Sequence, residues 1–332
     1  YRYKIAKLME SQKQWWIADE FCSMLDRDTA KIVAFNIQKI ARQMGKAVIL
    51  ATTHTDLFED LKPSVQIHKR FGKEISVNYY ANQPAKECSL AKEMQIEEGT
   101  FADYKKLSVF HYRTSHCPPP RKIFTLKRGH ELCGVIVYSY PSPTTFGRSK
   151  VWKGNFGKLQ REMSTISHVI VHPKYRTIGL GAKLVRESLP LAGTPYVEMI
   201  AVMAKYNPFA EKAGMHKIAV QSPSKEVVRI SDVLSRLGFN LQFLSSISYV
   251  EKKLEFLTKE QLAMLKEAFS KNAHPRLMKG FEACQHGVYC KKSEYVKGIK
   301  EADMLKMAKL IKIVGVLLQS KVYLFWQFDK AC

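Results

Sequence analysis

The sequence predicts an α/β chain whose C-terminal part is mostly helical, and three observations support this fold class. Two short apolar strands at 15–18 and 47–51 flank an amphipathic helix at 28–44. A glycine-containing turn joins an apolar strand at 164–171 to a helix at 179–189. Amphipathic helical patterns then dominate the end of the chain. Strands and helices that alternate in this way predict parallel strand pairs covered by helices.

The N-terminal strands and the helix between them form the first unit. A basic helical pattern at 1–9 precedes the strand at 15–18, and Gly45 stands where a residue of left-handed conformation commonly ends a helix. Both strands are continuous apolar runs, as expected in a parallel sheet that is covered by helices. The segment therefore predicts a βαβ unit.

The middle of the chain predicts a mixture of strands and helices after a stiff break at 117–120, which holds three consecutive prolines. The expected elements are a β-hairpin at 123–126 and 132–140, a loop rich in Pro, Gly and Ser at 141–157, the strand at 164–171, the helix at 179–189, a strand at 196–203, a short helix at 207–213 and a helix at 222–237.

The C-terminal region at 246–332 is expected to be mostly helical. Thr258 and Gln261 form a capping-box pattern at the start of one helix, and the apolar spacing at 302–318 predicts another. We divide the chain into an N-terminal unit (1–80), a linking segment that begins the next domain (81–120), a second α/β domain (121–245) and this helical region.

Composition limits the kinds of protein that fit. The chain has 332 residues, 46% of them apolar, and a formal net charge of +23. This charge favours polyanionic partners such as RNA or DNA, or the phosphates of a cofactor. Seven scattered cysteines without a signal peptide indicate a cytoplasmic protein, and no apolar run is long enough to span a membrane.

A pair of acids follows the first strand. Asp19 and Glu20 end the apolar run, Asp26 follows shortly after, and His54 ends the next strand. In nucleotide hydrolysis the first acid would hold Mg²⁺ and the second would polarise the attacking water. Structural acids at strand ends are also common, so the pair alone leaves both interpretations open.

This order of motifs resembles the Walker B strand, D-loop and switch histidine of ABC ATPases, with Phe21 in place of the usual proline. The resemblance covers residues 1–80. It implies that Asp19 would lie beside the Mg²⁺ of bound ATP and that Glu20 would be the base. It further implies that His54 would contact the γ-phosphate, and that Asp26 would lie at the interface of an ABC-type dimer.

The P-loop G-x-x-x-x-G-K-[ST] and the LSGGQ signature are both absent from the sequence. Without a P-loop, nothing in the chain would cradle the β- and γ-phosphates of ATP. We therefore expect a C-terminal fragment of a longer protein and no ATPase activity from this chain alone. ATP and Mg²⁺ would belong to the intact protein.

The turn at 171–182 is the second constellation. Its glycines allow the backbone to approach a ligand closely, and the amides at the start of the following helix can bind a pyrophosphate. Arg176, Gly179 and Gly181 match the R/Q-x-x-G-x-G/A motif, so that residues 100–245 resemble GNAT acetyltransferases. The resemblance implies an acetyl-CoA site made by Ile170, Val171, Arg176, Thr177, Ile178, Gly179, Leu180, Gly181, Ala182 and Asn207.

Acetyl transfer needs a base for the acceptor amine and an acid for the departing thiolate. Glu162, Glu198 and His168 are candidate bases, although a loop charge, a salt bridge and an outward strand residue are the ordinary alternatives. Many family members carry a tyrosine as the acid where this sequence has Ala210. Tyr206, one helical turn earlier, is the substitute that we expect.

The ABC-like segment followed by a GNAT-like domain resembles a family of predicted ABC ATPases fused to acetyltransferase domains. The first functional hypothesis is an N-acetyltransferase that is coupled to an ATPase in the intact protein, with RNA or a nucleic-acid-associated protein as acceptor. The alternative is a non-catalytic acetyl-CoA-binding module of a nucleic-acid-associated ABC ATPase, which the missing tyrosine favours.

Two weaker patterns complete the sequence-based expectations. Cys284, His286 and Cys290 could form half of a zinc site, although ordinary buried thiols are the favoured interpretation. Tyr323, Phe325, Trp326 and Phe328 could stack on bases, although a stripe of core residues is the favoured interpretation.

Overall fold

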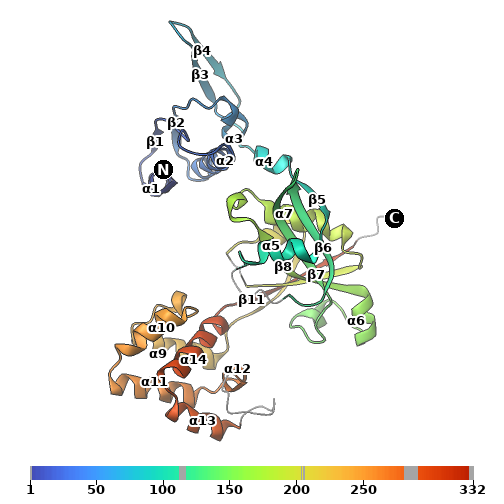
Figure 1. Ribbon diagram of the computed structural model, residues 1–332, viewed down its shortest axis with the longest axis vertical. Helices are drawn as coiled ribbons and strands as arrows, with labels where there is room; N and C mark the ends of the chain where they lie inside the picture. The colour runs from blue at the N-terminus through green and yellow to red at the C-terminus, as the bar shows by residue number, and fades with distance from the viewer. Residues whose placement is uncertain (1, 112–116, 203, 205, 280–290, 329–332) are drawn as a thin grey trace.

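The computed structural model describes residues 2–111, 117–202, 204, 206–279 and 291–328. Figure 1 shows three parts along the long axis: an N-terminal α/β unit, a central sheet with its helices, and a helical bundle. Within the described residues, no helix is both long and apolar enough to cross a membrane.

The N-terminal unit contains the predicted βαβ arrangement. It begins with α1 (Arg2–Glu10), β1 (Trp15–Ala18), α2 (Arg27–Gln43) and β2 (Ala47–Leu50), and β1 pairs with β2 in parallel. The apolar side of α2 packs with Trp16 in a common core. Gly45 has the expected positive φ of 64° just beyond α2.

A hairpin that the sequence patterns did not predict extends from this unit. After η1 (Thr55–Leu57) and α3 (Phe58–Leu61), β3 (Val65–Lys69) pairs with β4 (Ile75–Tyr79) in an antiparallel hairpin, at the top of Figure 1. The apolar side chains of the hairpin are exposed, so the hairpin gains little stability from packing against the rest of the described structure.

The central sheet has seven strands in the order β10-β11-β9-β8-β7-β6-β5. All neighbouring strands are antiparallel except β8 and β9, which are parallel. The strands are β5 (Gln95–Glu98), β6 (Pro120–Arg128), β7 (Glu131–Ser139), β8 (Met163–Val171), β9 (Tyr196–Ala201), β10 (His216–Gln221) and β11 (Lys321–Gln327).

Two strands of this sheet come from segments with other expectations. β5 lies in the segment expected to link the two domains and to begin the second, where no strand was predicted, and β11 lies in the region expected to be mostly helical. β11 inserts between β9 and β10, and its Tyr323 and Phe325 are buried, as expected of core residues. A boundary at 245 therefore does not separate the sheet from the C-terminal region, because strand pairing over this sequence distance leaves no local pattern.

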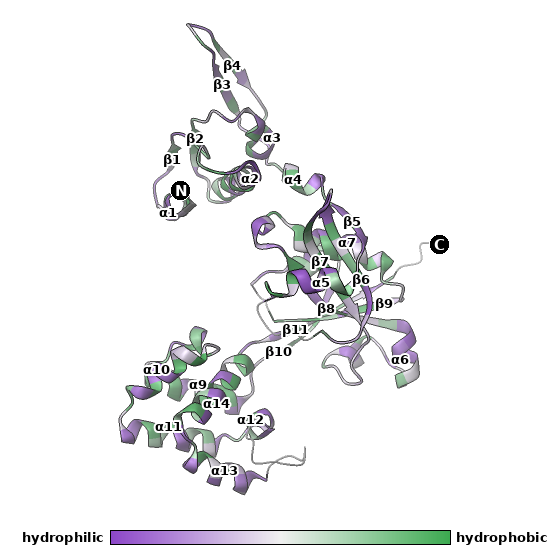
Figure 2. Cartoon of the chain, viewed as in Figure 1, coloured by the Kyte–Doolittle hydropathy of each residue, from purple (hydrophilic) through white to green (hydrophobic). Residues whose placement is uncertain are grey.

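Helices cover both faces of the sheet. α7 (Leu180–Ser188) packs on one face, with Leu184 against the strands, and α5 (Phe101–Ser108) packs on the other through Tyr104 and Leu107. The interior strand β7 is mostly apolar (Figure 2), as expected for a sheet buried on both faces, whereas β8 also carries Ser164, Thr165, Ser167 and His168. The short helices are α4 (Ser89–Lys92), α6 (Phe156–Glu162) and α8 (Phe209–Lys212).

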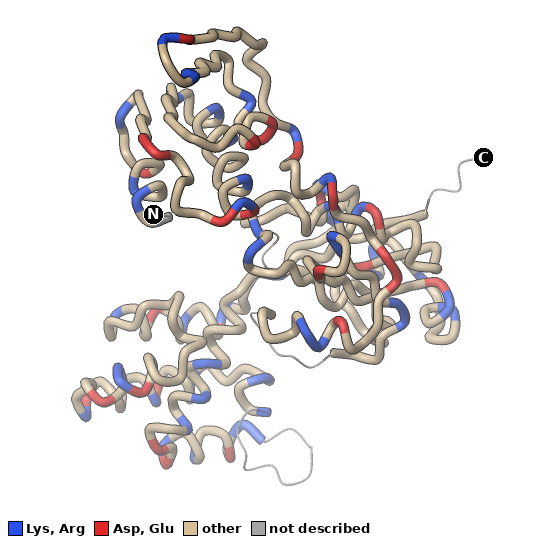
Figure 3. Tube along the Cα trace, turned by 45° about the horizontal axis from the view of Figure 1, so that its top comes forward, with Lys and Arg blue, Asp and Glu red and all other residues tan. Residues whose placement is uncertain are grey.

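The C-terminal helices form a bundle with its own core. They are α9 (Lys225–Arg236), α10 (Ile247–Glu255), α11 (Lys259–Lys271), α12 (Pro275–Lys279), α13 (Lys292–Glu301) and α14 (Met304–Leu317). The predicted capping box of Thr258 and Gln261 is present at the start of α11. Lys and Arg positions occur in all three parts (Figure 3), so net charge alone does not identify a polyanion-binding surface.

Candidate functional site

The parallel strands β8 and β9 separate partway along their length. Their pairing runs from Met163 and Tyr196 to Ile166 and Met199, where it ends, although β8 continues to Val171. Backbone groups inside a sheet need hydrogen-bond partners. The remaining part of β8 therefore presents a backbone edge to which an extended ligand with amide groups could add, as a strand would.

A β-bulge on β8 lies where this separation begins. Val137 of β7 pairs with His168, but Tyr138 pairs with Ile166, so Ser167 is the extra residue. A bulge bends a strand and increases its local twist. The bulge accounts for the divergence of β8 from β9 and places Ser167 and His168 beside the opening.

The glycine turn lies beyond the same end of β8. After η3 (Pro173–Tyr175), Thr177 and Gly179 have positive φ angles of 77° and 90°, and Gly179 is the N-cap of α7. Ala182 and Lys183 both donate their backbone N–H to the Gly179 carbonyl, at 3.1 Å. Leu180 and Gly181, the first two residues of the helix, have amides without a carbonyl one turn earlier.

The space above Gly179 is open. A side chain built on this residue would meet no atom within 4 Å, whereas one on Gly181 would contact the ring of Phe209 at 3.5 Å. Helix amides that face open space form a site for an anion, because the helix dipole favours negative charge there. The turn therefore has open space beside Gly179, and the helix amides next to it are of the kind that bind anions.

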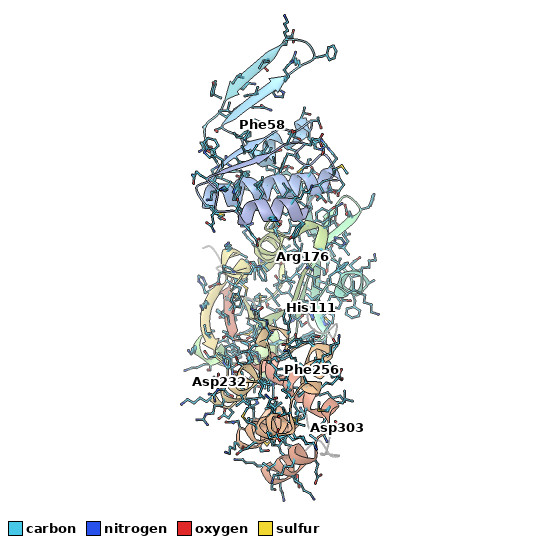
Figure 4. The ribbon with its side chains drawn as sticks, turned by 90° about the vertical axis from the view of Figure 1, so that its left-hand side faces the viewer. Phe58, His111, Arg176, Asp232, Phe256 and Asp303 are labelled. Atoms are coloured by element: carbon cyan, nitrogen blue, oxygen red, sulfur yellow. The ribbon has the colours of Figure 1, made fainter. Side chains whose placement is uncertain are left out.

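Arg176 holds its positive charge beside the turn. Its Nε donates to the Val171 carbonyl at 3.2 Å, and its Nη2 donates to the Phe110 carbonyl at 3.3 Å. In Figure 4, Arg176 lies just below the helices of the N-terminal unit. The side chain thus joins the end of β8 to the segment after α5 and remains exposed at the predicted ligand position.

Ile170 and Val171 lie between the opening and the turn. They pair on one side with Val135 and Gly134 of β7, and the ladder to β9 has already ended at their level. The side chain of Ile170 is buried among the residues that α5 covers, and Val171 packs toward the face covered by α7. Their backbone is therefore in position to line a channel that leads to the turn.

Glu198, one of the candidate bases, is held in a buried ion pair. Nε and Nη2 of Arg148 contact its two carboxylate oxygens at 2.9 and 2.6 Å. Thr165 and Tyr323 also donate to it, at 2.8 and 2.9 Å. Burial and the neighbouring carboxylate raise the pKa of Tyr323. These donors occupy the oxygens of Glu198, so the geometry assigns it the role of a structural acceptor.

Glu162 lies at the opposite end of β8 from the turn. It ends α6, where it accepts a hydrogen bond from Trp152 Nε1 at 3.1 Å and lies 3.8 Å from Lys158. The bulge at Ser167 is five residue steps away, which corresponds to roughly 16 Å along an extended chain. Its position therefore does not place its carboxylate beside the opening.

His168 is the candidate base that lies at the opening. Its side chain is buried, with Nε2 at 3.5 Å from the hydroxyl of Tyr104 and Nδ1 at 3.3 Å from the hydroxyl of Ser167. The ring of His111 lies 4.7 Å from its ring, centre to centre. An imidazole among hydroxyl groups and a second imidazole can accept a proton and pass it on.

The residues proposed for the acid and for a further cofactor contact lie in one segment. Tyr206 and Asn207 are exposed and precede α8, and the side chain of Ala210 is buried within α8. α8 packs against α7, so this segment lies on the α7 side of the opening. The position where a tyrosine acid was expected therefore faces the core and carries no titratable group.

Asp19 and Glu20 directly follow the C-terminal end of β1, His54 lies shortly after the end of β2, and Asp26 directly precedes α2. Asp19 accepts a hydrogen bond from the Glu20 amide at 2.9 Å, and His54 Nε2 donates to the Cys22 carbonyl at 3.1 Å. Asp26 caps α2 by accepting from the Thr29 amide at 3.0 Å, which lowers the pKa of Asp26. The contact of His54 thus joins the segment after β2 to the loop after β1.

A nucleotide site at this edge would be incomplete within the chain. Arg27 contacts both His54 and Asp56, which occupies the predicted γ-phosphate contact. The part of the chain that the structure describes contains no cluster of three or more potential metal ligands. Because the sequence also lacks a P-loop, these residues alone do not make a complete site for ATP and Mg²⁺. The zinc half-site of Cys284, His286 and Cys290 lies outside the described residues.

Known proteins similar to this chain are acetyltransferases of solved structure. One is an acetyltransferase from Bacillus subtilis in complex with CoA, 12% identical over 71% of this chain and 99% of its own, with a TM-score of 0.31. A second is a GNAT family acetyltransferase from Elizabethkingia anophelis with acetyl-CoA bound. It is 10% identical over 71% of this chain and 99% of its own, with a TM-score of 0.31.

A third similar structure is NAA60 of Arabidopsis thaliana in complex with acetyl-CoA. It is 15% identical over 39% of this chain and 88% of its own, with a TM-score of 0.30. These likenesses concern the fold alone. No protein-family model and no curated protein matches the chain.

Proposed function

We propose that this chain binds acetyl-CoA and transfers its acetyl group to an amine. The observation that carries this proposal is the coincidence of two features at the same end of β8. One is the backbone edge left where the β8–β9 ladder ends at Ile166, and the other is the anion-binding turn around Gly179. A long ligand with amide groups and a pyrophosphate matches both features at once.

The binding half of the function is assigned to the turn and the end of β8. Of the predicted amides from Arg176 to Ala182, those of Leu180 and Gly181 at the start of α7 would hold the pyrophosphate, because the Ala182 amide bonds to the Gly179 carbonyl, and Arg176 would add its charge. The backbone of Ile170 and Val171 would pair with the pantetheine arm. Asn207, exposed ahead of α8, would contact the cofactor from the other side of the opening.

The chemical half requires proton movement at the opening. Acetyl-CoA would supply the acetyl group as a thioester, and His168 would accept the proton that the attacking amine loses. The Tyr104 hydroxyl near Nε2 would orient the ring of His168. Tyr206 would return a proton to the departing thiolate. Glu162 and Glu198 are less suited to be the base, because one lies far along β8 and the other is held by Arg148.

The N-terminal unit would belong to an ABC-type ATPase in the intact protein. The support is the order of Asp19, Glu20, Asp26 and His54, which resembles such ATPases, and the contact of His54 with the Cys22 carbonyl in the loop after β1. The acceptor would be RNA or a nucleic-acid-associated protein, for which the net charge of +23 is the support. ATP, Mg²⁺ and ABC-type dimerisation would be properties of the intact protein.

A titration and a transfer assay test the proposal together. Calorimetric titration of the full chain with CoA should give a dissociation constant between about 1 μM and 1 mM, the range of ordinary enzyme–substrate affinities. Labelled acetyl-CoA incubated with cell extract should label RNA or protein, and Gly179→Glu should abolish the labelling. Absence of CoA binding at millimolar concentration would contradict the proposal.

The alternative is a binding module that does not transfer the acetyl group. The buried Ala210 at the usual acid position favours it, because that position provides no proton for the thiolate. His168→Ala separates the two functions. An enzyme should lose about 100-fold or more in transfer rate with little change in CoA affinity. A binding module would show CoA affinity in both forms and transfer in neither.

A further inference from the structure

The helix α2 of the N-terminal unit contacts the glycine turn directly. Asn36, on α2, donates from Nδ2 to the hydroxyl of Thr177 at 2.9 Å across 141 positions of sequence. The same amide group also donates to the Ile32 carbonyl at 2.8 Å, which fixes its direction on the helix. The turn that resembles a coenzyme-binding motif is therefore not formed by its own domain alone.

Thr177 is the residue of this turn that most needs such support. Its φ of 77° lies in the left-handed region, which is unfavourable for a β-branched side chain. A residue in this conformation persists only when its surroundings hold it there. The hydrogen bond from Asn36 reaches the side chain of this residue, two positions before the N-cap glycine of α7.

A second connection lies at the start of α2. Asp28, in its first turn, receives bidentate hydrogen bonds from Arg128 at 2.8 Å and an ion pair from Lys174 at 2.6 Å. The Tyr175 hydroxyl adds a donor at 3.3 Å. Lys174 and Tyr175 form the 3-10 turn that leads into Arg176, so Asp28 fixes the entry to the turn.

The ionic cluster around Asp28 is only partly exposed. Asp28 and Arg128 keep 18% and 22% of their side-chain surface in contact with solvent. The hydrogen bond from Arg128 holds the pKa of Asp28 far below its usual value, and Asp28 raises the pKa of Lys174. Charge-assisted bonds that are partly shielded from water are stronger than surface pairs.

The apolar side of α2 strengthens the same contact. Ile32 and Phe35 are buried in the core of the central sheet, which also contains Tyr175 and Ile178 of the turn region. α2 therefore packs against the turn through a buried patch between its two polar contacts, Asp28 and Asn36. Contacts at three levels along one helix fix its position relative to the turn.

We propose that α2 positions the coenzyme-binding turn, with Asn36 holding Thr177 in its left-handed conformation and Asp28 anchoring the entry to the turn. Asn36 and Asp28 act through the turn and are positioning residues for acetyl-CoA. This inference rests on the proposed function of the turn. It makes the affinity for acetyl-CoA a property of the N-terminal unit as well as of the central sheet.

One consequence concerns regulation. α2 begins directly after Asp26 and the acidic loop that holds Asp19 and Glu20. A change in that loop that shifts α2 would move Asn36 relative to Thr177. The loss of this hydrogen bond would then alter the conformation of the turn and its affinity for the coenzyme. By linkage, coenzyme binding at the turn would act back on the acidic loop with an equal free energy.

A double-mutant cycle in the full chain tests the role of Asn36. Calorimetric titration with CoA is carried out for wild type, Asn36→Ala, Thr177→Gly and the double variant, with thermal unfolding of each. Glycine adopts a left-handed φ without strain, so Thr177→Gly should remove the need for Asn36. Lys39→Ala, an exposed position on α2, is the matched control.

The expected result is a loss that depends on Thr177. Asn36→Ala should weaken CoA binding about fivefold in the wild-type background, which corresponds to one hydrogen bond. In the Thr177→Gly background the same change should alter the dissociation constant by less than about twofold, which is the non-additivity of coupled residues. Lys39→Ala should leave it unchanged.

Other outcomes overturn the inference in distinguishable ways. If wild type binds CoA and Asn36→Ala binds equally well, α2 does not position the turn, and the proposed function stands. Equal losses in both backgrounds would show that Asn36 acts through overall stability. If wild type does not bind CoA at all, the proposed function fails and this inference fails with it.

Discussion

Helices α2 and α7 both follow a strand in a parallel β–turn–helix–β arrangement, yet their N-termini differ. α2 is capped by its own carboxylate, since Asp26 accepts a hydrogen bond from the Thr29 amide. The N-cap of α7 is Gly179, which has no side chain to cap the helix. A capped N-terminus has satisfied amides and carries a negative charge, whereas the uncapped one leaves amides for a ligand. We therefore expect the first to repel anions and the second to be the one that binds them.

The same comparison explains why the two units touch where they do. The N-terminal turn of α2 carries the additional acid Asp28, which binds the basic residues Arg128 and Lys174 around the entry to the second turn. The acidic helix end thus neutralises the base of the basic turn and leaves Arg176 facing the ligand position. The acidic end of α2 and the basic residues at the end of β6 and in η3 therefore join the units.

Conversion of the open N-terminus into a capped one should have the largest effect. Gly179→Asp places a carboxylate at the N-cap of α7, as Asp26 does in α2. At the start of α7 this carboxylate would compete with the pyrophosphate for the same amides and would repel the pyrophosphate. We expect CoA affinity to fall by about 100-fold or more, measured by calorimetric titration. Gly179→Ala is the control, because it has the same backbone strain without the charge. A similar loss in both variants would refute the electrostatic explanation.

Removal of the charge that joins the units should have the next largest effect. Asp28→Asn leaves Arg128 and Lys174 with the more distant Glu131, and Arg128 also with Glu93 at 4.0 Å, and it should lower the free energy of unfolding by roughly 2 kcal/mol. Chemical denaturation of both proteins measures this change in the free energy of unfolding. Glu59→Gln, which breaks an exposed pair with Lys92, should change stability by less than about 0.5 kcal/mol. Equal effects of the two substitutions would contradict the importance of the junction.

The same carboxylate predicts a dependence on pH. The folded-state pKa of Asp28 is depressed, so its stabilisation is complete above the unfolded value near 4 and is lost as pH falls through the folded pKa. Between pH 7 and pH 3, wild type should lose about 1 kcal/mol more than Asp28→Asn, measured by denaturation at each pH. Parallel losses in both proteins would place the acid sensitivity elsewhere.

Removal of the cap of α2 should have the smallest effect. Asp26→Ala leaves the Thr29 amide without its partner and should reduce stability by about 1 kcal/mol, while Asp26→Asn should retain most of the cap. Thermal unfolding compares the two variants. An equal loss in both variants would show that the charge, which both remove, matters more than the hydrogen bond.

Local patterns predicted much of this molecule. The βαβ unit, the strand at β8, the glycine turn and the capping box at Thr258 all follow from periodicity, turn chemistry and spacing within short windows. The binding half of the candidate site falls in one such window, between Ile170 and Ala182. Apart from Asn207, its residues could be named individually from the sequence, and their role in binding stays a prediction.

Long-range contacts could not be predicted in this way. The insertion of β11 between β9 and β10, the ion pair between Arg148 and Glu198, and the contact from Asn36 to Thr177 join distant segments. Glu198 was considered as a base because an acid on a strand can serve either role, and only the surrounding donors decide between them. The surroundings of His168 favour it as the base, because the bulge places it beside the opening and the Tyr104 hydroxyl lies near its Nε2.

Hydrogen–deuterium exchange with and without CoA tests the assignment of the coenzyme site most directly, because it reports where the ligand lies. We predict that CoA slows exchange in peptides covering the end of β8 and the turn, Ser167 to Ala182, with a smaller effect in α2 around Asn36. Peptides from the bundle helices should not change. Protection confined to the bundle or to the acidic loop at Asp19, or no protection at saturating CoA, would contradict this assignment.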